Sequence, residues 1–151
     1  MTEVLFYHLQ KMSLETVLPP LLEKSLQRGW RVVVQSTSQE RTDALDAHLW
    51  TYRDDSFLPH VTSRAGDLAD QPIILAVEEG NPNGAHVRFL IDNAALPADS
   101  ESYERLVLVF NGDDADSLAS ARSAWTACKS RGFEVTYWRA DERGRWRRQN
   151  K

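Results

Sequence analysis

The stretch LVLVFNGDDADSLASARSAWTACKSRGFEVTYW, residues 106–138, decides the fold class. The apolar run LVLVF at its start is typical of a buried strand. Residues 113–131 have the length of a helix, with three Asp near the start, where the helix dipole favours negative charge. Gly132 ends this helix, and FEVTYW predicts another strand. A strand, a helix and a strand in succession indicate two parallel strands joined by a crossover helix.

The rest of the chain repeats this alternation. A helix is expected from Leu14 to Gly29, either kinked at Pro19-Pro20 or beginning near Pro20. A second helix is expected to begin at the capping box of residues 37–40, with Thr37 as the cap, and to run through Leu49. Further strands are expected at residues 4–9, 31–35, 72–77 and 87–91. The sequence therefore predicts an α/β fold with a mostly parallel sheet of about five or six strands.

Size and composition are those of one globular domain spanning residues 1–151. Of the 151 residues, 42% are hydrophobic and 26% are charged, which is typical of a soluble protein. No apolar run approaches the ~18–20 residues of a membrane span, and the first residues do not resemble a signal peptide. Cys128 is the single cysteine, which excludes an internal disulfide. We expect a cytoplasmic protein that does not contact membranes.

Charge is unevenly distributed along the chain. Residues 129–151 hold eight Lys or Arg and three Asp or Glu, a net charge of +5, which leaves −9 for residues 1–128 out of a total of −4. A basic extension from about residue 139 suggests an anionic partner, such as nucleic acid or an acidic peptide. A solubilising tail explains the same pattern, and the sequence leaves both open.

Catalytic motifs were sought and not found. The seven glycines form neither GxGxxG nor a P-loop, and the four histidines show no metal-binding spacing. GxSxG is also absent. The adjacent acidic pairs of the chain are typical of turns and helix caps, although they keep an acid–base role open. No catalytic residue, cofactor site or metal site is predicted, and a nucleotide-using enzyme is the weakest alternative.

The last helix carries a possible binding surface. Its narrow apolar stripe consists of Leu118, Ala121, Trp125 and Cys128. Arg122 and Lys129 lie about 20° apart at the rim of this stripe, beside the edge of Trp125. A cation at the lip of an apolar shelf suits a ligand that is both hydrophobic and anionic, such as a C-terminal residue with a free carboxylate. Two ordinary solvated cations beside a core tryptophan are the alternative.

The segment LWTYRDDSFLPH, residues 49–60, carries a second possible surface. Trp50 falls on the polar face of its helix, with Asp43 and Asp46. Phe57 and Leu58 precede Pro59 in an extended segment, so one side chain should enter the core and the other should face outward. Exposed aromatics at the two ends of a loop are typical anchors of a protein interface. A loop folded back over its own core is the alternative.

Several of these features together resemble the chi subunit family of the bacterial DNA polymerase III holoenzyme. The most specific match is Leu49-Trp50 followed by the segment SFLPH at residues 56–60. The other matching segments are Phe6-Tyr7, residues 31–33 after Gly29, Leu45-Asp46, the strand ending at Phe110, Ala121-Arg122 with the aromatic at 125, and Gly132-Phe133.

The resemblance implies a three-layer α/β/α Rossmann-like domain that is an adaptor without catalytic activity or cofactor. Members of the family pair with the psi subunit, which ties them to the clamp-loader complex. They also hold the acidic C-terminal tail of single-stranded DNA-binding protein, which ends in Pro-Phe with a free carboxylate. Some share the psi surface with a damage-response helicase. Contact with DNA is then mostly indirect.

The resemblance also implies roles for individual residues. Arg122 matches the arginine that receives the tail, Trp125 matches an aromatic of that pocket, and Lys129 stands nearby. Leu118 and Thr126 depart from the pattern, because relatives can carry lysines at these positions. The residues implied in psi binding are Leu49, Trp50, Phe57 and Leu58. A competing reading is direct nucleic-acid binding by the basic end, where Trp138 and Trp146 are interleaved with arginines.

Overall fold

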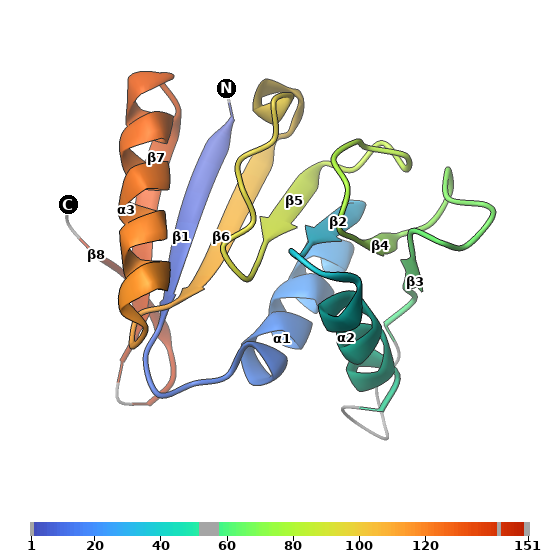
Figure 1. Ribbon diagram of the computed structural model, residues 1–151, viewed down its shortest axis with the longest axis horizontal. Helices are drawn as coiled ribbons and strands as arrows, with labels where there is room; N and C mark the ends of the chain where they lie inside the picture. Colours follow the sequence, from blue (N-terminus) through green and yellow to red (C-terminus); the bar gives the residue numbers. More distant parts are fainter. Residues whose placement is uncertain (1, 52–57, 142, 150–151) are drawn as a thin grey trace.

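The computed structural model describes residues 2–51, 58–141 and 143–149, which form one sheet with helices on both faces (Figure 1). The sheet order is β3-β4-β2-β5-β6-β1-β7-β8, parallel throughout except for the antiparallel pair β7 and β8. The strands are β1 (Glu3–Leu9), β2 (Val32–Gln35), β3 (Val61–Thr62), β4 (Ile73–Ala76), β5 (Val87–Leu90), β6 (Arg105–Asn111), β7 (Glu134–Ala140) and β8 (Trp146–Gln149). The helices are α1 (Leu14–Gln27), α2 (Gln39–Thr51), α3 (Ala115–Ser130) and the 3-10 turn η1 (Ser100–Ser102). The predicted α/β class and mostly parallel sheet are confirmed.

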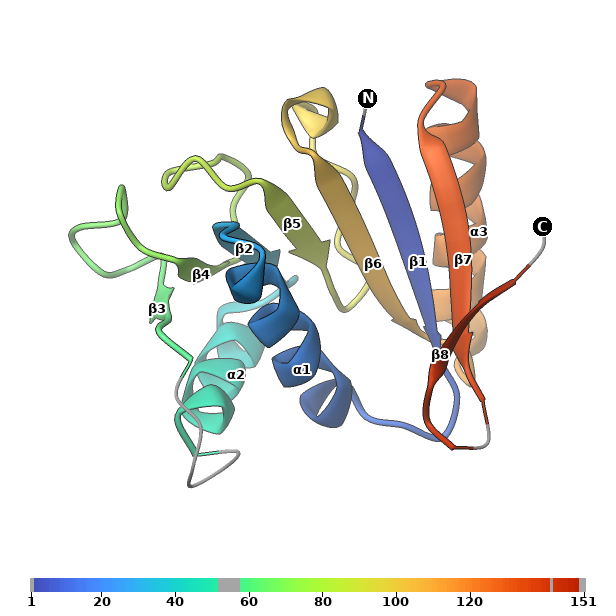
Figure 2. The ribbon, with the colours of Figure 1, turned by 180° about the vertical axis from the view of Figure 1, so that it is seen from behind.

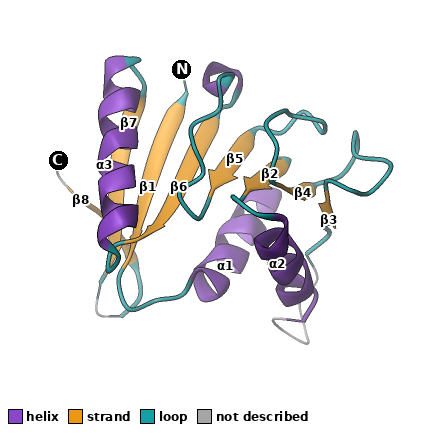
Figure 3. Cartoon of the chain, viewed as in Figure 1, coloured by secondary structure: helices purple, strands orange, loops and turns teal. Residues whose placement is uncertain are grey.

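The three layers are visible in Figure 3, where α1 and α2 lie on one face of the sheet and α3 lies on the other. Each face has its own apolar core. The side chains of Leu18, Leu22 and Val34 belong to the α1–α2 core, and those of Phe6, Leu106 and Cys128 belong to the α3 core. Alternate residues of the central strands supply these two cores because successive side chains of a strand point to opposite faces.

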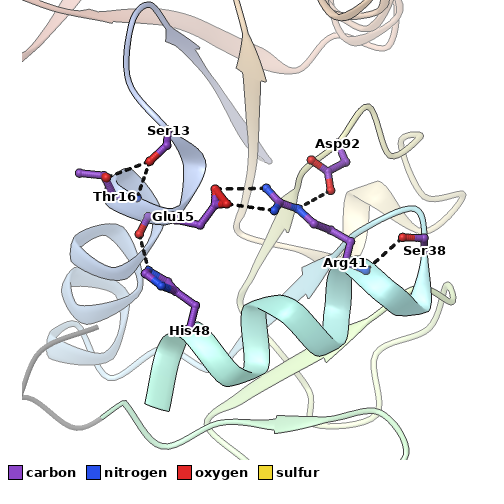
Figure 4. A network of polar contacts seen from close by, with 7 residues as sticks. All are labelled: Ser13, Glu15, Thr16, Ser38, Arg41, His48 and Asp92. Atoms are coloured by element: carbon purple, nitrogen blue, oxygen red, sulfur yellow. Dashed lines mark hydrogen bonds and ion pairs between the residues drawn. The ribbon is translucent and has the colours of Figure 1, made fainter. Parts of the chain in front are cut away.

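Helix α1 begins at Leu14 and includes both prolines, rather than beginning near Pro20. Ser13 caps it, with its side chain accepting a hydrogen bond from the backbone N–H of Thr16 at 3.2 Å. Pro19 has no N–H, so the carbonyl of Glu15 has no donor within the helix. That carbonyl instead accepts a hydrogen bond from Nε2 of His48, 2.8 Å away on α2 (Figure 4). The neighbouring helix therefore compensates for the proline.

Helix α2 begins one residue later than the capping box predicted. Ser38, not Thr37, acts at the cap, because its hydroxyl accepts a hydrogen bond from the backbone N–H of Arg41 at 3.1 Å. The Arg41 guanidinium lies between two carboxylates, Glu15 of α1 and Asp92 after β5, at 3.2 and 2.8 Å (Figure 4). These contacts fix α2 against α1 and the sheet, and thereby fix the C-terminal turn of α2 that carries Trp50.

Two strands raise the count from the expected five or six to eight. The short strand β3 pairs with β4, in a part of the chain where no strand was expected. The basic extension folds back as β8, pairing Trp138 with Arg148 and Ala140 with Trp146. The turn between β7 and β8 is organised by Asp141, whose carboxylate accepts the backbone N–H groups of Arg143 and Arg145. Hydrogen bonds from backbone N–H groups, chiefly that of Arg145, lower the pKa of Asp141 to about 2.

A buried arginine stabilises the middle of the sheet. Arg88 of β5 is fully buried and donates to Oε1 of Gln35 through Nε and Nη2, at 3.0 and 2.7 Å. Its remaining donors reach the carbonyls of Glu78 and Gly80 and the hydroxyl of Tyr103. Because a buried guanidinium needs partners for its N–H groups, this network locks the 78–80 loop onto the sheet.

None of the helices that the structure describes has the length and apolar character needed to cross a membrane.

Candidate partner-binding sites

Helix α3 is placed by a cap at one end and a glycine at the other. The Asp114 carboxylate accepts the backbone N–H of Ser117 at 2.8 Å, and Gly132 follows the helix with a φ of +79°. This hydrogen bond lowers the pKa of Asp114. The predicted apolar stripe faces the sheet as expected, with Ala121 and Cys128 buried and Leu118 and Trp125 partly buried.

A groove of about 560 Å³ lies beside α3, where the helix meets β7. We name it the tail groove. It is lined by His8, Phe110, Leu118, Ala121, Arg122, Trp125, Thr126, Tyr137, Arg139 and Gln149. Two of the three residues expected to bind the tail, Arg122 and Trp125, therefore lie in one depression with side chains from β1, β7 and β8.

Trp125 forms the apolar wall of the tail groove. Its ring lies edge to face against Phe6, with centroids 5.3 Å apart, and against Tyr137, with centroids 5.9 Å apart. The third expected residue, Lys129, does not line the groove, but its Nζ lies 5.6 Å from the centre of the Trp125 ring. A cation over an indole face is attracted by the ring quadrupole. Lys129 therefore adds positive charge to the outer edge of the same wall.

The electrostatics of the tail groove favour an anion. Arg122 and Arg139 both line it, and the described lining residues include no carboxylate. Burial lowers the pKa of His8, and the charge of Arg139 lowers it further, so His8 is mostly neutral at pH 7. Burial raises the pKa of Tyr137, against the opposing effect of the two arginines. The groove therefore offers two permanent positive charges beside neutral, partly apolar walls.

The floor of the tail groove depends on a close approach between β1 and the turn after β6. His8 is buried, and its Nδ1 is hydrogen-bonded to the Tyr137 hydroxyl. A Cβ built on Gly112 would overlap the His8 imidazole. A glycine is therefore required at 112 for His8 to keep its place between Phe110 and Tyr137.

The groove residues that were not identified from the sequence include His8, Tyr137 and Arg139. The alternation in FEVTYWR carried a signal, because Tyr137 and Arg139 occupy the same face of a strand, two residues apart. Which face meets α3 depends on the register between β7 and β1, which pairs Phe6 with Tyr137 and His8 with Arg139. That register pairs residues about 130 positions apart, so local sequence does not determine it.

The second candidate surface lies at the end of α2. Trp50 is 49% exposed, and its ring lies against the buried imidazole of His60, with centroids 4.3 Å apart. The ring nitrogens of His60 contact the carbonyl of Leu58 at 2.6 Å and Asp46 at 3.2 Å. His60 is thus held from both sides and supports the tryptophan. We name this area the Trp50 surface; exposure of Trp50 on the polar face of α2 agrees with the expectation from the sequence.

Two other residues expected at this surface have buried side chains. Leu49 and Leu58 are 1% and 2% exposed and belong to the core beneath α1 and α2. Both side chains pack in the core in this conformation, and a role for them in psi binding stays a prediction. Phe57 lies outside the described residues.

Outside these two surfaces, the candidates for reactive chemistry are the thiol of Cys128 and clusters of metal-binding side chains. Cys128 is fully buried, and desolvation raises the pKa of its thiol to about 11, in keeping with an inert packing role. Among the residues that the structure describes, no cluster of three or more His, Cys, Asp and Glu could hold a metal ion.

Comparisons with known proteins identify the family. Residues 1–136 match the family described as DNA polymerase III chi subunit, HolC. A probable DNA polymerase III subunit chi from Rickettsia prowazekii is 30% identical over 91 residues, which cover 60% of this chain and 55% of the relative. The DNA polymerase III subunit chi of Pseudomonas aeruginosa is 35% identical over 78 residues, 52% of this chain and 51% of the relative. The aligned parts thus span about half the length of these relatives. The family match covers β1 to β6 and all three α-helices, and it ends within β7, before Tyr137, Arg139 and Gln149 of the tail groove. The chain therefore belongs to the DNA polymerase III chi subunit (HolC) family.

Proposed function

We propose that the chain is a non-catalytic accessory subunit of DNA polymerase III that acts as an adaptor in DNA replication, in the cytoplasm at the replication fork. One face, the tail groove, binds the acidic C-terminal tail of single-stranded DNA-binding protein. The other, the Trp50 surface, binds the psi subunit, which links the adaptor to the clamp-loader complex. Family membership supports the accessory role.

The observation that carries tail binding is the composition of the tail groove. An aromatic wall, Trp125, stands beside Arg122 and Arg139, with no carboxylate among the described lining residues. A tail ending in Pro-Phe needs an apolar shelf for the phenylalanine ring and a cation for the terminal carboxylate. The groove supplies both within one depression, and Arg139 adds a second cation for the acidic residues that precede the terminus.

Psi binding is supported by the exposure of Trp50. A tryptophan that is half exposed and rests on a rigid histidine has little conformational entropy to lose when a partner covers it, which is typical of an interface anchor. The network of Arg41, Glu15 and His48 holds α2 in place beneath it. A damage-response helicase is a further candidate for this surface, in competition with psi.

A fluorescence anisotropy titration tests tail binding. A labelled acidic peptide ending in Pro-Phe-COOH should bind saturably, and more weakly as salt shortens the Debye length from about 10 Å at 0.1 M. Loss of one charge-assisted hydrogen bond to the carboxylate should weaken binding by about tenfold in Arg122→Ala. C-terminal amidation of the peptide should cause a similar loss.

Arg148→Ala is the matched control, since it removes an arginine from β8 on the sheet face away from the tail groove. It should leave peptide affinity within about twofold of wild type, because Arg148 does not line the groove. Equal binding of the free-acid and amidated peptides would contradict carboxylate recognition. Equal losses of peptide affinity in Arg122→Ala and Arg148→Ala would show that the peptide is held by general charge attraction and not by the tail groove.

The psi surface has its own test. Trp50→Ala should weaken binding of purified psi by about thirtyfold or more, as truncation of a hot-spot tryptophan does. It should leave peptide binding unchanged, because Trp50 is on α2 and the tail groove is beside α3. If Trp50→Ala binds psi as wild type does, this surface is not the psi site.

A further inference from the structure

The sheet has an uncovered face that neither partner site uses. Helix α1 packs over β2, and its core extends to Val107 and Val109 of β6, whereas among the described helices none lies over β1 and β7 on this side (Figure 2). Figure 2 shows β1 and β7 from that side, with β8 crossing at one end. The tail groove lies on the opposite side, beneath α3. Any ligand of the uncovered face is therefore independent of tail binding.

Aromatic side chains form a row across this face. Tyr7 of β1 pairs with Trp138 of β7, and Trp138 pairs with Arg148 of β8, so the three side chains share one face. Trp146, two residues from Arg148 on the same strand, joins them. The Tyr7 ring centroid is 4.7 Å from that of Trp146 and 6.2 Å from that of Trp138. All three rings are partly exposed.

The orientation of these rings is fixed by neighbouring groups. The Trp138 indole N–H donates to the Thr136 hydroxyl at 2.8 Å. Tyr7 and Trp146 pack against the α1–α2 core. A row of rings held by the sheet requires little ordering when a ligand stacks on it.

Cations flank the row on two sides. A groove of about 300 Å³ between α1 and the sheet brings Tyr7 together with Lys24, Arg28 and Arg105, and its described lining includes no carboxylate. The Arg28 and Arg105 guanidinium carbons lie 4.0 and 5.0 Å from the centre of the Trp30 ring, which holds them near each other.

Arg105 also pairs with Glu3 at 2.6 Å, which offsets part of its charge. On the other side of the aromatic row, Arg148 is exposed. The positive charges thus bracket the rings, and do not form one patch beside them.

We propose that this surface, formed by Tyr7, Trp138 and Trp146 with Arg28, Arg105 and Arg148, binds single-stranded nucleic acid. Bases would stack on the exposed parts of the rings, and the arginines on either side would contact phosphates. A duplex hides its base faces and could use only the arginines. An acidic peptide would gain little from three aromatic rings in a row. A row of rings flanked by cations therefore matches a single strand best.

The test is a fluorescence anisotropy titration of the full chain with a labelled oligothymidine strand at low salt. Wild type should bind saturably, and affinity should fall steeply with salt as phosphate contacts are screened. Arg28→Glu and Arg148→Glu should each weaken binding by about tenfold or more. Arg143→Glu makes the same charge change at an exposed position of the β7–β8 turn, outside the two strands, and should change affinity by less than about threefold.

A second variant isolates stacking from charge. Trp138→Leu keeps apolar bulk on the sheet but removes the ring, and should weaken binding by about fivefold or more. Unlabelled tail peptide should not displace the strand, because the two sites lie on opposite faces.

The proposal is overturned if folded wild type does not bind the strand at low salt, or if a duplex of equal length binds as well. It is equally overturned if Arg143→Glu matches the loss in Arg148→Glu, or if an acidic peptide competes for the Arg148-dependent site. Failure of tail binding would leave this result unaffected, since none of its residues lines the tail groove.

Discussion

Gly112→Ala should deform the floor of the tail groove. An added Cβ would overlap the His8 ring at Nε2, Cδ2 and Cε1, and the ring is buried with Phe110 and Tyr137 around it. Overpacking of this kind costs about 1–3 kcal/mol. Displacing His8 also breaks its hydrogen bond to Tyr137, which is worth about 1 kcal/mol net. We expect unfolding free energy to fall by about 2–4 kcal/mol in total.

Urea denaturation of four proteins measures this effect: wild type, Gly112→Ala, His8→Ala and the double variant. If the clash is with His8, the alanine at 112 should cost less than about 0.5 kcal/mol once His8 is already alanine. Gly66→Ala is the matched control, because nothing lies within 4 Å of a Cβ there and its φ is not positive. Removing a glycine at such a site should be neutral or slightly stabilising.

The reasoning would be refuted by an equal cost of Gly112→Ala with and without His8, since the strain would then lie in the backbone. A cost for Gly66→Ala equal to that for Gly112→Ala would refute it as well. Where Gly112→Ala folds, its affinity for the Pro-Phe-COOH peptide should also fall, because the displaced imidazole lines the groove.

Three further predictions concern other parts of the molecule. Hydrogen bonding from Arg41 lowers the pKa of Glu15, so this pair stabilises the fold above the ordinary carboxyl pKa near 4.5 and is lost as pH falls through the lowered value. In urea denaturation between pH 6 and about 2, the unfolding free energy of Arg41→Gln should therefore fall less with decreasing pH than that of wild type. An unchanged pH dependence would contradict the assignment. Cys128 should react with a thiol reagent about two orders of magnitude more slowly in the native state than in urea, since burial raises its pKa to about 11; fast native labelling would show the thiol to be accessible. Arg88→Met should cost about 3 kcal/mol or more in thermal unfolding, because Gln35 and two carbonyls lose their buried donor, and a cost below about 1 kcal/mol would indicate that water replaces the guanidinium.

Local sequence predicted the helices and most of the strands, because each element carries its own periodicity and its own ends. The apolar run at 106–110 and the glycine at 132 are sufficient to place β6 and the end of α3. The sequence left an alternative open where another part of the chain supplies a missing group. Whether the first helix runs through Pro19-Pro20 or begins near Pro20 was undecided, and α1 runs through both prolines, with His48 donating to the freed carbonyl of Glu15 across 33 positions.

Some features of the candidate sites likewise follow from local spacing, and others depend on distant parts of the chain. A helical repeat is enough to place Trp125 in the apolar stripe of α3, Arg122 at the rim of that stripe and Leu49 in the core, because 3.6 residues per turn separates the faces of a helix. The repeat could not show that Arg139 lines the same groove as Arg122, or that Leu58 is the buried member of the pair Phe57-Leu58.

The sequence by itself determined the α/β class and the parallel strands, which follow from the order of the elements along the chain. It also determined the apolar stripe of α3 and the exposure of Trp50, which follow from spacing within one helix. Only the tertiary structure decided which cations share a cavity and which aromatics share a face. Strand register sets both: a shift of one residue in β7 would place Tyr137 and Arg139 on the uncovered face and Trp138 beneath α3. That register is fixed by packing between β1, β6 and β7, residues more than a hundred positions apart, and no local pattern encodes it.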